Sequence, residues 1–144
     1  METRCITTIS ELETLAGGVL SSCVKKDTAH VLALSGDLGA GKTAFTKVLG
    51  KTLGVAGEIT SPTFVIMKSY TIPNHSFFKT LVHIDAYRIE SDDEMRVLGF
   101  SELLTDETKL ICIEWPEKIQ SLIPSDAHTV TITLNMDGTR EVTF

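Results

Sequence analysis

The chain has 144 residues, enough for one domain with a substantial core, and 42% of them are hydrophobic. Its formal net charge is −6 and no Lys/Arg cluster is present, which disfavours direct binding to DNA or RNA through a basic face. No apolar run is long enough to cross a bilayer, and the N-terminus lacks the pattern of a secretory signal, so we expect a cytoplasmic protein.

The cysteines and histidines are scattered along the chain without the close spacing that metal sites require. No Cys-x-x-Cys pair is present, and each cysteine stands in an apolar pattern. We therefore expect buried structural thiols rather than a disulfide framework or a zinc site. The cysteines are Cys5, Cys23 and Cys112, and the histidines are His30, His75, His83 and His128.

The first predicted elements are a short strand over Arg4 to Ile9 and a helix over Glu11 to Lys25. Ser10 and Glu13 have the spacing of a capping box at the start of this helix. Apolar residues then recur at helical spacing, which predicts one buried face.

A predicted strand over Val31 to Ser35 leads into Gly36-Asp37-Leu38-Gly39-Ala40-Gly41-Lys42-Thr43, which matches the P-loop pattern G-x-x-x-x-G-K-T. A helix follows and is expected to end near Gly54. In a P-loop, backbone N–H groups and the helix N-terminus bind phosphates. The lysine (Lys42) contacts the terminal phosphates and the hydroxyl (Thr43) binds Mg²⁺. The alternative is a chance glycine turn, which the strand–loop–helix context disfavours.

Two strands over Phe64 to Ile72 and Phe77 to Ile84 are predicted to pair antiparallel around the turn Pro73 to Ser76. A short helix is expected to open at Ser91, and a second helical piece to follow Gly99.

The rest of the chain predicts a buried strand over Leu110 to Ile113 and a helix over Glu117 to Leu122. A strand over Val130 to Met136 follows, and Asp137-Gly138 indicates a final hairpin. This order of elements predicts an α/β fold of P-loop NTPase type, with a mixed parallel/antiparallel sheet flanked by helices. We expect one ATPase domain over residues 1–144.

Two carboxylates qualify as the acidic partner that a P-loop needs to hold Mg²⁺ or to orient the attacking water. Asp85 follows the apolar run Leu81 to Ile84, and Glu114 follows Leu110 to Ile113. Ligands bind at the carboxyl ends of strands in open α/β sheets, so at least one of the two is expected to be functional. Which of them contacts Mg²⁺ stays open; an exposed strand-end acid or a helix cap is the alternative for either.

Three further residues are candidates with a structural alternative each. Thr63 follows the P-loop helix and is a candidate γ-phosphate sensor, or else a threonine bonded to nearby backbone. Arg88 could neutralise charge on the transferred phosphoryl group, or pair with Glu90 or Asp92 on the surface. Trp115 could stack near the nucleotide or a partner, or form part of the core.

The chain has no Asn-Lys-x-Asp motif, which reads guanine in GTPases, so we favour ATP as the ligand. Two function classes lead: an ATPase that drives a partner complex, and a nucleotide-gated binding module in which hydrolysis is incidental. A small-molecule kinase is a weaker third alternative, since the short segment from Glu90 to Leu104 offers no lid.

Four ordered motifs together resemble the TsaE (YjeE) family, and the resemblance covers nearly the whole chain. They are the P-loop from Gly36 to Thr43, Ser61-Pro62-Thr63-Phe64, His83-Ile84-Asp85-Ala86-Tyr87-Arg88, and Ile113-Glu114-Trp115-Pro116-Glu117.

The resemblance implies an ATPase of tRNA threonylcarbamoyladenosine (t6A) biosynthesis that binds and hydrolyses Mg-ATP. It also implies partnership with TsaB and TsaD proteins, of which TsaD modifies adenosine 37 of ANN-decoding tRNAs, so contact with the tRNA pathway would be indirect. By motif, Lys42 and Thr43 would serve the phosphates and Mg²⁺, Thr63 would be the switch threonine, and Asp85 and Glu114 the acidic pair. Trp115 follows Glu114 as in the family.

Overall fold

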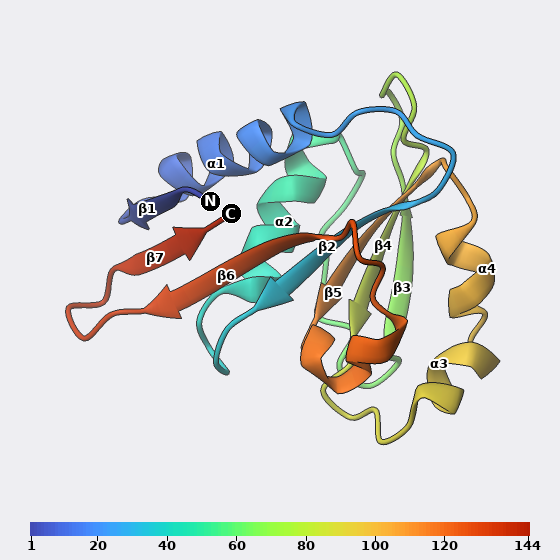
Figure 1. Cartoon of the computed structure of the whole chain (residues 1–144). Coiled ribbons are helices and arrows are strands. Elements are labelled where there is room, and N and C mark those ends of the chain that lie inside the picture. Colours follow the sequence, from blue (N-terminus) through green and yellow to red (C-terminus); the bar gives the residue numbers. More distant parts are fainter.

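A computed structural model of residues 1–144 shows a seven-stranded mixed sheet with the strand order β1-β7-β6-β2-β5-β4-β3 (Figure 1). The neighbours of the P-loop strand β2 are both parallel to it, and β4 is parallel to β5. The remaining pairs are antiparallel, so the predicted mixed α/β sheet is confirmed. The strands are β1 (Thr3–Ile6), β2 (His30–Ser35), β3 (Met67–Thr71), β4 (Thr80–Asp85), β5 (Lys109–Glu114), β6 (His128–Leu134) and β7 (Arg140–Thr143).

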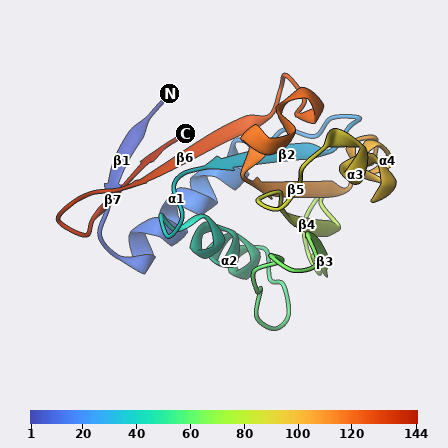
Figure 2. The same cartoon turned by 90° about the horizontal axis from the view of Figure 1, so that it is seen from below.

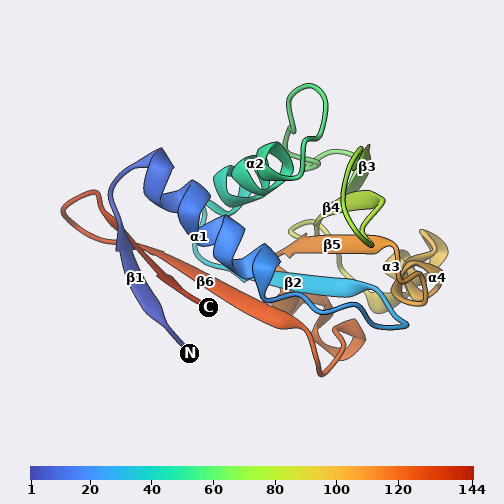
Figure 3. The same cartoon turned by 90° about the horizontal axis from the view of Figure 1, so that it is seen from above.

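Helices cover both faces of the sheet, as Figures 2 and 3 show from opposite sides. One face packs on α1 and α2, and the other on α3, α4 and the 3₁₀ helix η1. The strands β2, β4 and β5 are buried on both faces because each face lies against a helical layer, whereas β6 alternates apolar residues with threonine. None of the helices is long and apolar enough to span a membrane. The helices are α1 (Ile9–Ser21), α2 (Lys42–Thr52), α3 (Asp92–Val97), α4 (Phe100–Leu104) and η1 (Pro116–Leu122).

The first helix begins earlier than predicted because two capping boxes overlap in the sequence. Thr8 is the N-cap, and its hydroxyl accepts the N–H of Glu11 at 3.2 Å. The Glu11 carboxylate in turn accepts the N–H and the hydroxyl of Thr7. The Ser10–Glu13 box is therefore not used. The helix also ends at Ser21 rather than Lys25.

The strand β3 begins later than predicted because the segment before it forms a turn. The carbonyl of Pro62 accepts the N–H groups of Val65 and Ile66 at 3.1 and 2.6 Å. Ile66 has a positive φ of 67°, which ends any extended conformation there. Phe64, predicted inside the strand, is 87% exposed.

The start of β4 also moves, because two aromatic residues belong to the turn before it. The N–H groups of Phe77 and Phe78 donate to Nδ1 of His75 at 3.2 and 3.1 Å. Their rings pack against the same imidazole. The connection between the two antiparallel strands is consequently longer than the predicted four-residue turn from Pro73 to Ser76.

The two ends of the chain meet at one edge of the sheet (Figure 1). β1 pairs with β7, and the backbones of Glu2 and Phe144 exchange hydrogen bonds of 2.9 Å. β7 follows β6 through the expected hairpin, with Gly138 at a φ of 86°.

The three thiols differ in burial, which corrects the expectation that all are buried. Cys5 lies exposed on the edge strand β1, Cys23 is half-buried, and Cys112 is fully buried in β5. All three are free.

Candidate nucleotide-binding site

The P-loop joins the central strand β2 to α2 and depends on glycine at both ends. Gly36 has a φ of 153°, and a Cβ there would collide with the carbonyl oxygen of Ile132 on β6. Gly41 is the N-cap of α2, with a φ of 115° and no side chain to occupy the helix N-terminus. The unpaired N–H groups of the first helical turn therefore stay available for an anion.

Lys42 folds back over the P-loop. Its ammonium donates to the carbonyls of Gly36 and Asp37, the latter at 3.1 Å, and lies 4.1 Å from the centroid of the Trp115 ring. Burial lowers the pKa of Lys42, while the nearby Glu114 carboxylate acts in the opposite direction. A phosphate entering the loop would replace carbonyl oxygens with a better partner for this charge.

The two predicted acids are neighbours at the carboxyl ends of adjacent strands. Asp85 and Glu114 are register partners in β4 and β5, and Glu114 is also paired with Leu34 of β2. The Thr43 hydroxyl donates to the two carboxylate oxygens of Glu114 at 2.9 and 3.1 Å. Both acids are almost completely buried. The P-loop hydroxyl and a strand-end carboxylate thus form one oxygen-lined centre.

Thr63 belongs to the same group of side chains because it contacts Asp85, the second acid. Its hydroxyl donates to Asp85 at 3.3 Å and lies 2.6 Å from the Ser61 hydroxyl. The second oxygen of Asp85 accepts the N–H of Tyr87 at 3.0 Å. The loop after α2 is therefore linked to the strand-end carboxylate directly.

Of the two remaining candidates, one faces the site and the other does not. Trp115 lines the pocket in a left-handed backbone conformation, with a φ of 59°. Arg88 is exposed, and its guanidinium lies 5.1 Å from the centroid of the Phe64 ring. It forms no ion pair with Glu90 or Asp92, contrary to the surface alternative, and it does not line the pocket.

A pocket of about 280 Å³ brings most of the predicted site residues together. It is lined by the P-loop, the Thr63 loop and the two strand ends. The side with Thr63, Asp85 and Glu114 is polar, so it suits the terminal phosphate and a cation. The lining residues are Leu38, Gly39, Gly41, Lys42, Thr43, Ala44, Ser61, Thr63, Asp85, Tyr87, Glu114 and Trp115.

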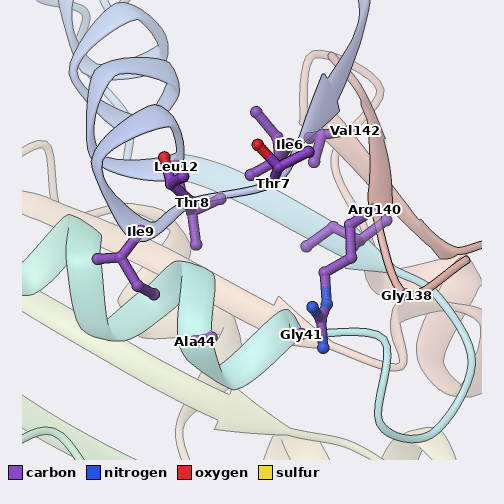
Figure 4. Close-up of a pocket in the computed structure, with 11 residues that line it drawn as sticks. Ile6, Thr7, Thr8, Ile9, Leu12, Gly41, Ala44, Gly138, Arg140 and Val142 are labelled. Atoms are coloured by element: carbon purple, nitrogen blue, oxygen red, sulfur yellow. The ribbon is translucent and has the colours of Figure 1, made fainter.

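A second pocket of about 310 Å³ lies on the other side of the P-loop and shares Gly41 and Ala44 with the first (Figure 4). Its walls are mainly apolar and come from the start of α1 and from the C-terminal hairpin. Arg140 extends from β7 to the P-loop, where its Nε donates to the carbonyl of Ala40 at 2.8 Å. The two pockets therefore adjoin each other at the N-terminus of α2, where both are lined by Gly41 and Ala44.

The donor set fits Mg²⁺ better than a transition metal. No group of three His, Cys, Asp or Glu side chains is arranged to hold a metal ion. A hydroxyl from Thr43 and carboxylates from Glu114 and Asp85 are hard oxygen ligands, and Mg²⁺ typically takes one or two protein carboxylates together with substrate phosphates and water.

Sequence reasoning missed two side chains of this region, Arg140 and His83. Arg140 lies on the same inward-facing side of β7 as the buried Val142. A charged residue at a position where the alternation predicts an apolar one was the sequence feature that could have identified it. His83 is fully buried, and its Nε2 lies 2.6 Å from a Glu114 oxygen. The sequence places it in the motif from His83 to Arg88 but assigns it no role, because nothing in the local pattern separates it from an ordinary core residue.

Comparisons with known proteins agree with one another. The family model described as "Threonylcarbamoyl adenosine biosynthesis protein TsaE" matches residues 6–142. The chain is 36% identical over 137 residues to the tRNA threonylcarbamoyladenosine biosynthesis protein TsaE of Bacillus subtilis, covering 95% of this chain and 82% of that protein. The protein of the same name in Treponema pallidum is 34% identical over 140 residues, covering 97% and 98%.

A solved structure is similar over almost the whole fold. The crystal structure of Bacillus subtilis YdiB superposes with a TM-score of 0.72 at 29% sequence identity, covering 98% of this chain and 82% of that one. The similarity therefore extends to the arrangement of the whole sheet and its helices.

Proposed function

The chain belongs to the TsaE family of threonylcarbamoyl adenosine biosynthesis proteins, and from this premise we propose that it is a Mg²⁺-dependent ATPase. In this proposal, hydrolysis supports a complex of TsaB- and TsaD-like proteins that carries out the t6A modification of adenosine 37. The chain itself would perform no carbamoyl transfer.

The observation that carries the proposal is the contact of Thr43 with Glu114, 2.9 Å between hydroxyl and carboxylate oxygen, beside Lys42. A P-loop hydroxyl next to a strand-end acid is the arrangement that P-loop NTPases use to hold a cation on the terminal phosphates. We assign Glu114 to the cation together with Thr43 because these two side chains touch. Asp85 and Thr63, which bond to each other, are assigned to the terminal phosphate and the attacking water.

The roles of the other residues follow from charge and position. Lys42 would exchange its bonds to the loop carbonyls for the terminal phosphates, and the N–H groups of the loop and of α2 would hold the remaining oxygens. Trp115 would cover Lys42 and limit access of water to the reacting phosphate. When bound, Mg²⁺ supplies charge that stabilises the phosphates during transfer.

The nucleoside is assigned to the second pocket. If the terminal phosphate faces Thr63 and the acids, the phosphate chain must pass Ala44 toward the start of α1. The apolar walls there suit a purine ring, and Arg140 lies where the phosphates and the ribose meet. This assignment adds Arg140 to the candidate ligands predicted from the motif alone.

The dependence on partners has its own support in the surface around the site. Leu38 and Tyr87 line the first pocket and are 79% and 46% exposed, and Phe64, next to Thr63 in the loop after α2, is 87% exposed. Exposed apolar side chains that gather beside one site are candidates for contact with another protein. We therefore expect slow hydrolysis by the isolated chain and faster hydrolysis in the complex.

The test is phosphate release from ATP and from GTP, with and without TsaB- and TsaD-like proteins of the same organism. ATP should be preferred, and Lys42→Ala should lose nucleotide binding while keeping its circular dichroism spectrum. Lys47→Ala is the matched control, because Lys47 lies on the same helix but is paired on the surface with Glu58. Unaltered ATP binding by Lys42→Ala would refute the site.

A nucleotide-gated binding module remains as a second candidate, because the Thr63 loop that touches Asp85 also carries the exposed Phe64. In that case ATP binding would order the loop for docking, and hydrolysis would be incidental. Glu114→Ala separates the two functions: repeated rounds of tRNA modification by a variant that binds but does not hydrolyse ATP would favour the module.

A further inference from the structure

His83 is a buried polar side chain whose single hydrogen bond is to the centre of the candidate site. It lies in β4, two positions before Asp85 on the same face of the sheet, with no exposed surface. Its Nε2 is 2.6 Å from Oε2 of Glu114, which is itself 4% exposed. The ring therefore links β4 to the acid at the end of β5.

The hydrogen bonds determine which ring nitrogen carries the proton. An ionised carboxylate only accepts hydrogen bonds, so Nε2 is the donor to Glu114. The other nitrogen, Nδ1, is buried and has no partner, which a lone pair tolerates better than an N–H group would. This favours the Nε2–H tautomer, in which the only hydrogen bond of the His83 ring is the one it donates to Glu114.

We propose that His83 is a positioning residue that holds the Glu114 carboxylate against Thr43. This inference rests on the proposed function, because it concerns the same hydrolytic centre. The imidazole occupies one direction of approach to Oε2, and the Thr43 hydroxyl approaches from the P-loop side. With these two donors the carboxylate keeps one orientation, in which Oε1 has no bond to the imidazole and contacts only the Thr43 hydroxyl, at 3.1 Å.

An orienting partner of this kind typically changes activity by about 10–100-fold when removed. His83→Leu fills a similar volume without a donor, so it should lower kcat by about that factor. ATP affinity without Mg²⁺ should not change, because neither His83 nor its bond to Glu114 touches the P-loop backbone. His83→Gln places an amide N–H close to the position of Nε2 and should recover most of the lost kcat.

Cys112→Ala is the matched control for damage to the core. Cys112 is the register partner of His83, is equally buried, and makes no hydrogen bond to Glu114. It should lower thermal stability and leave kcat unchanged. A purely structural role for His83 would make His83→Gln as slow as His83→Leu, or Cys112→Ala as slow as both, and either result overturns the proposal.

A second measurement separates this proposal from the proposed function. In ¹⁵N-histidine NMR spectra of the full chain, His83 should show the Nε2–H tautomer, and that proton should shift in Glu114→Gln. The Nδ1–H tautomer, or a proton that Glu114→Gln leaves unchanged, overturns the positioning role whether or not the protein hydrolyses ATP. Absence of hydrolysis by the wild-type complex, with the NMR result as expected, refutes only the ATPase function.

Discussion

Replacing Arg140 with alanine removes the side-chain donor that braces the P-loop from the C-terminal hairpin. The bond from Arg140 Nε to the carbonyl of Ala40 is 2.8 Å long, and Ala40 is buried, so its oxygen loses a partner that water cannot easily replace. A hydrogen bond with one charged partner contributes about 1.5–3 kcal/mol. The lower end applies because Arg140 is half-exposed.

A loss of about 1.5 kcal/mol corresponds to about a tenfold weaker nucleotide affinity if the bond holds the loop in its binding conformation. Titration of the purified chain with a fluorescent ATP analogue measures the change in nucleotide affinity. Denaturation with urea measures any part of the loss of about 1.5 kcal/mol that appears in the free energy of unfolding instead. Arg140→Lys should recover part of the affinity, since lysine keeps the charge but not the planar donor group.

Glu141→Ala is the control for Arg140→Ala, because Glu141 is exposed and alternates to the other face of β7. It should bind nucleotide like the wild type. Wild-type values of both the nucleotide affinity and the urea midpoint in Arg140→Ala would show that the Arg140–Ala40 bond does not hold the P-loop.

Gly36→Ala should lower the free energy of unfolding by about 1–3 kcal/mol and abolish nucleotide binding. The Cβ of the new alanine would meet the carbonyl oxygen of Ile132, and the backbone there has a positive φ. Urea denaturation measures the loss of stability, and nucleotide titration measures the loss of binding. Nucleotide affinity should fall as pH rises through the pKa of Lys42, since burial holds that pKa below the ordinary 10.5 and only the protonated amine attracts phosphate. Binding titrations from neutral to alkaline pH follow this loss, and Lys47→Ala, the control, should show the same pH dependence as the wild type. A thiol reagent should label Cys5 rapidly in the native protein and Cys112 only after unfolding, because burial shields the Cys112 thiol and raises its pKa; mass spectrometry of the labelled peptides separates the two.

Each of these three predictions has a result that contradicts it. Native stability in Gly36→Ala would mean that the loop tolerates a Cβ. A nucleotide affinity that stays constant over this pH range, or a changed pH dependence in Lys47→Ala, would contradict the role given to the Lys42 ammonium. Labelling of Cys112 before unfolding would show that β5 opens locally in the native state.

The order of elements was predictable from the sequence because the signals that define it are local. The P-loop pattern, the apolar run of β2 and the glycine after α2 all act within a few residues. Local patterns did not fix the start of α1, because Thr8 with Glu11 and Ser10 with Glu13 both have the spacing of a capping box. The contact of Thr7 with Glu11 favours the earlier cap, and only the folded geometry reveals it.

The site was predictable where a motif names its residues, and not where the contact is distant in the chain. Asp85 and Glu114 follow apolar strands, and their neighbouring register follows from parallel pairing. Arg140 on β7 reaches Ala40 past the single intervening strand β6, but the two residues are 100 positions apart in the chain, so no local pattern connects them. The final hairpin contains none of the four motifs, yet it provides a wall of the second pocket.

The position of the C-terminal hairpin has a consequence for the protein during its synthesis. β6 pairs with β2 directly beside the P-loop, and β7 supplies Arg140, yet both strands leave the ribosome after every motif residue has been made. A nascent or truncated chain that ends before His128 carries the full P-loop sequence but exposes the edge of β2 and lacks the brace on Ala40. If the site binds ATP as proposed, this ability would be acquired late in translation, and prematurely terminated fragments should not compete with the finished protein for ATP.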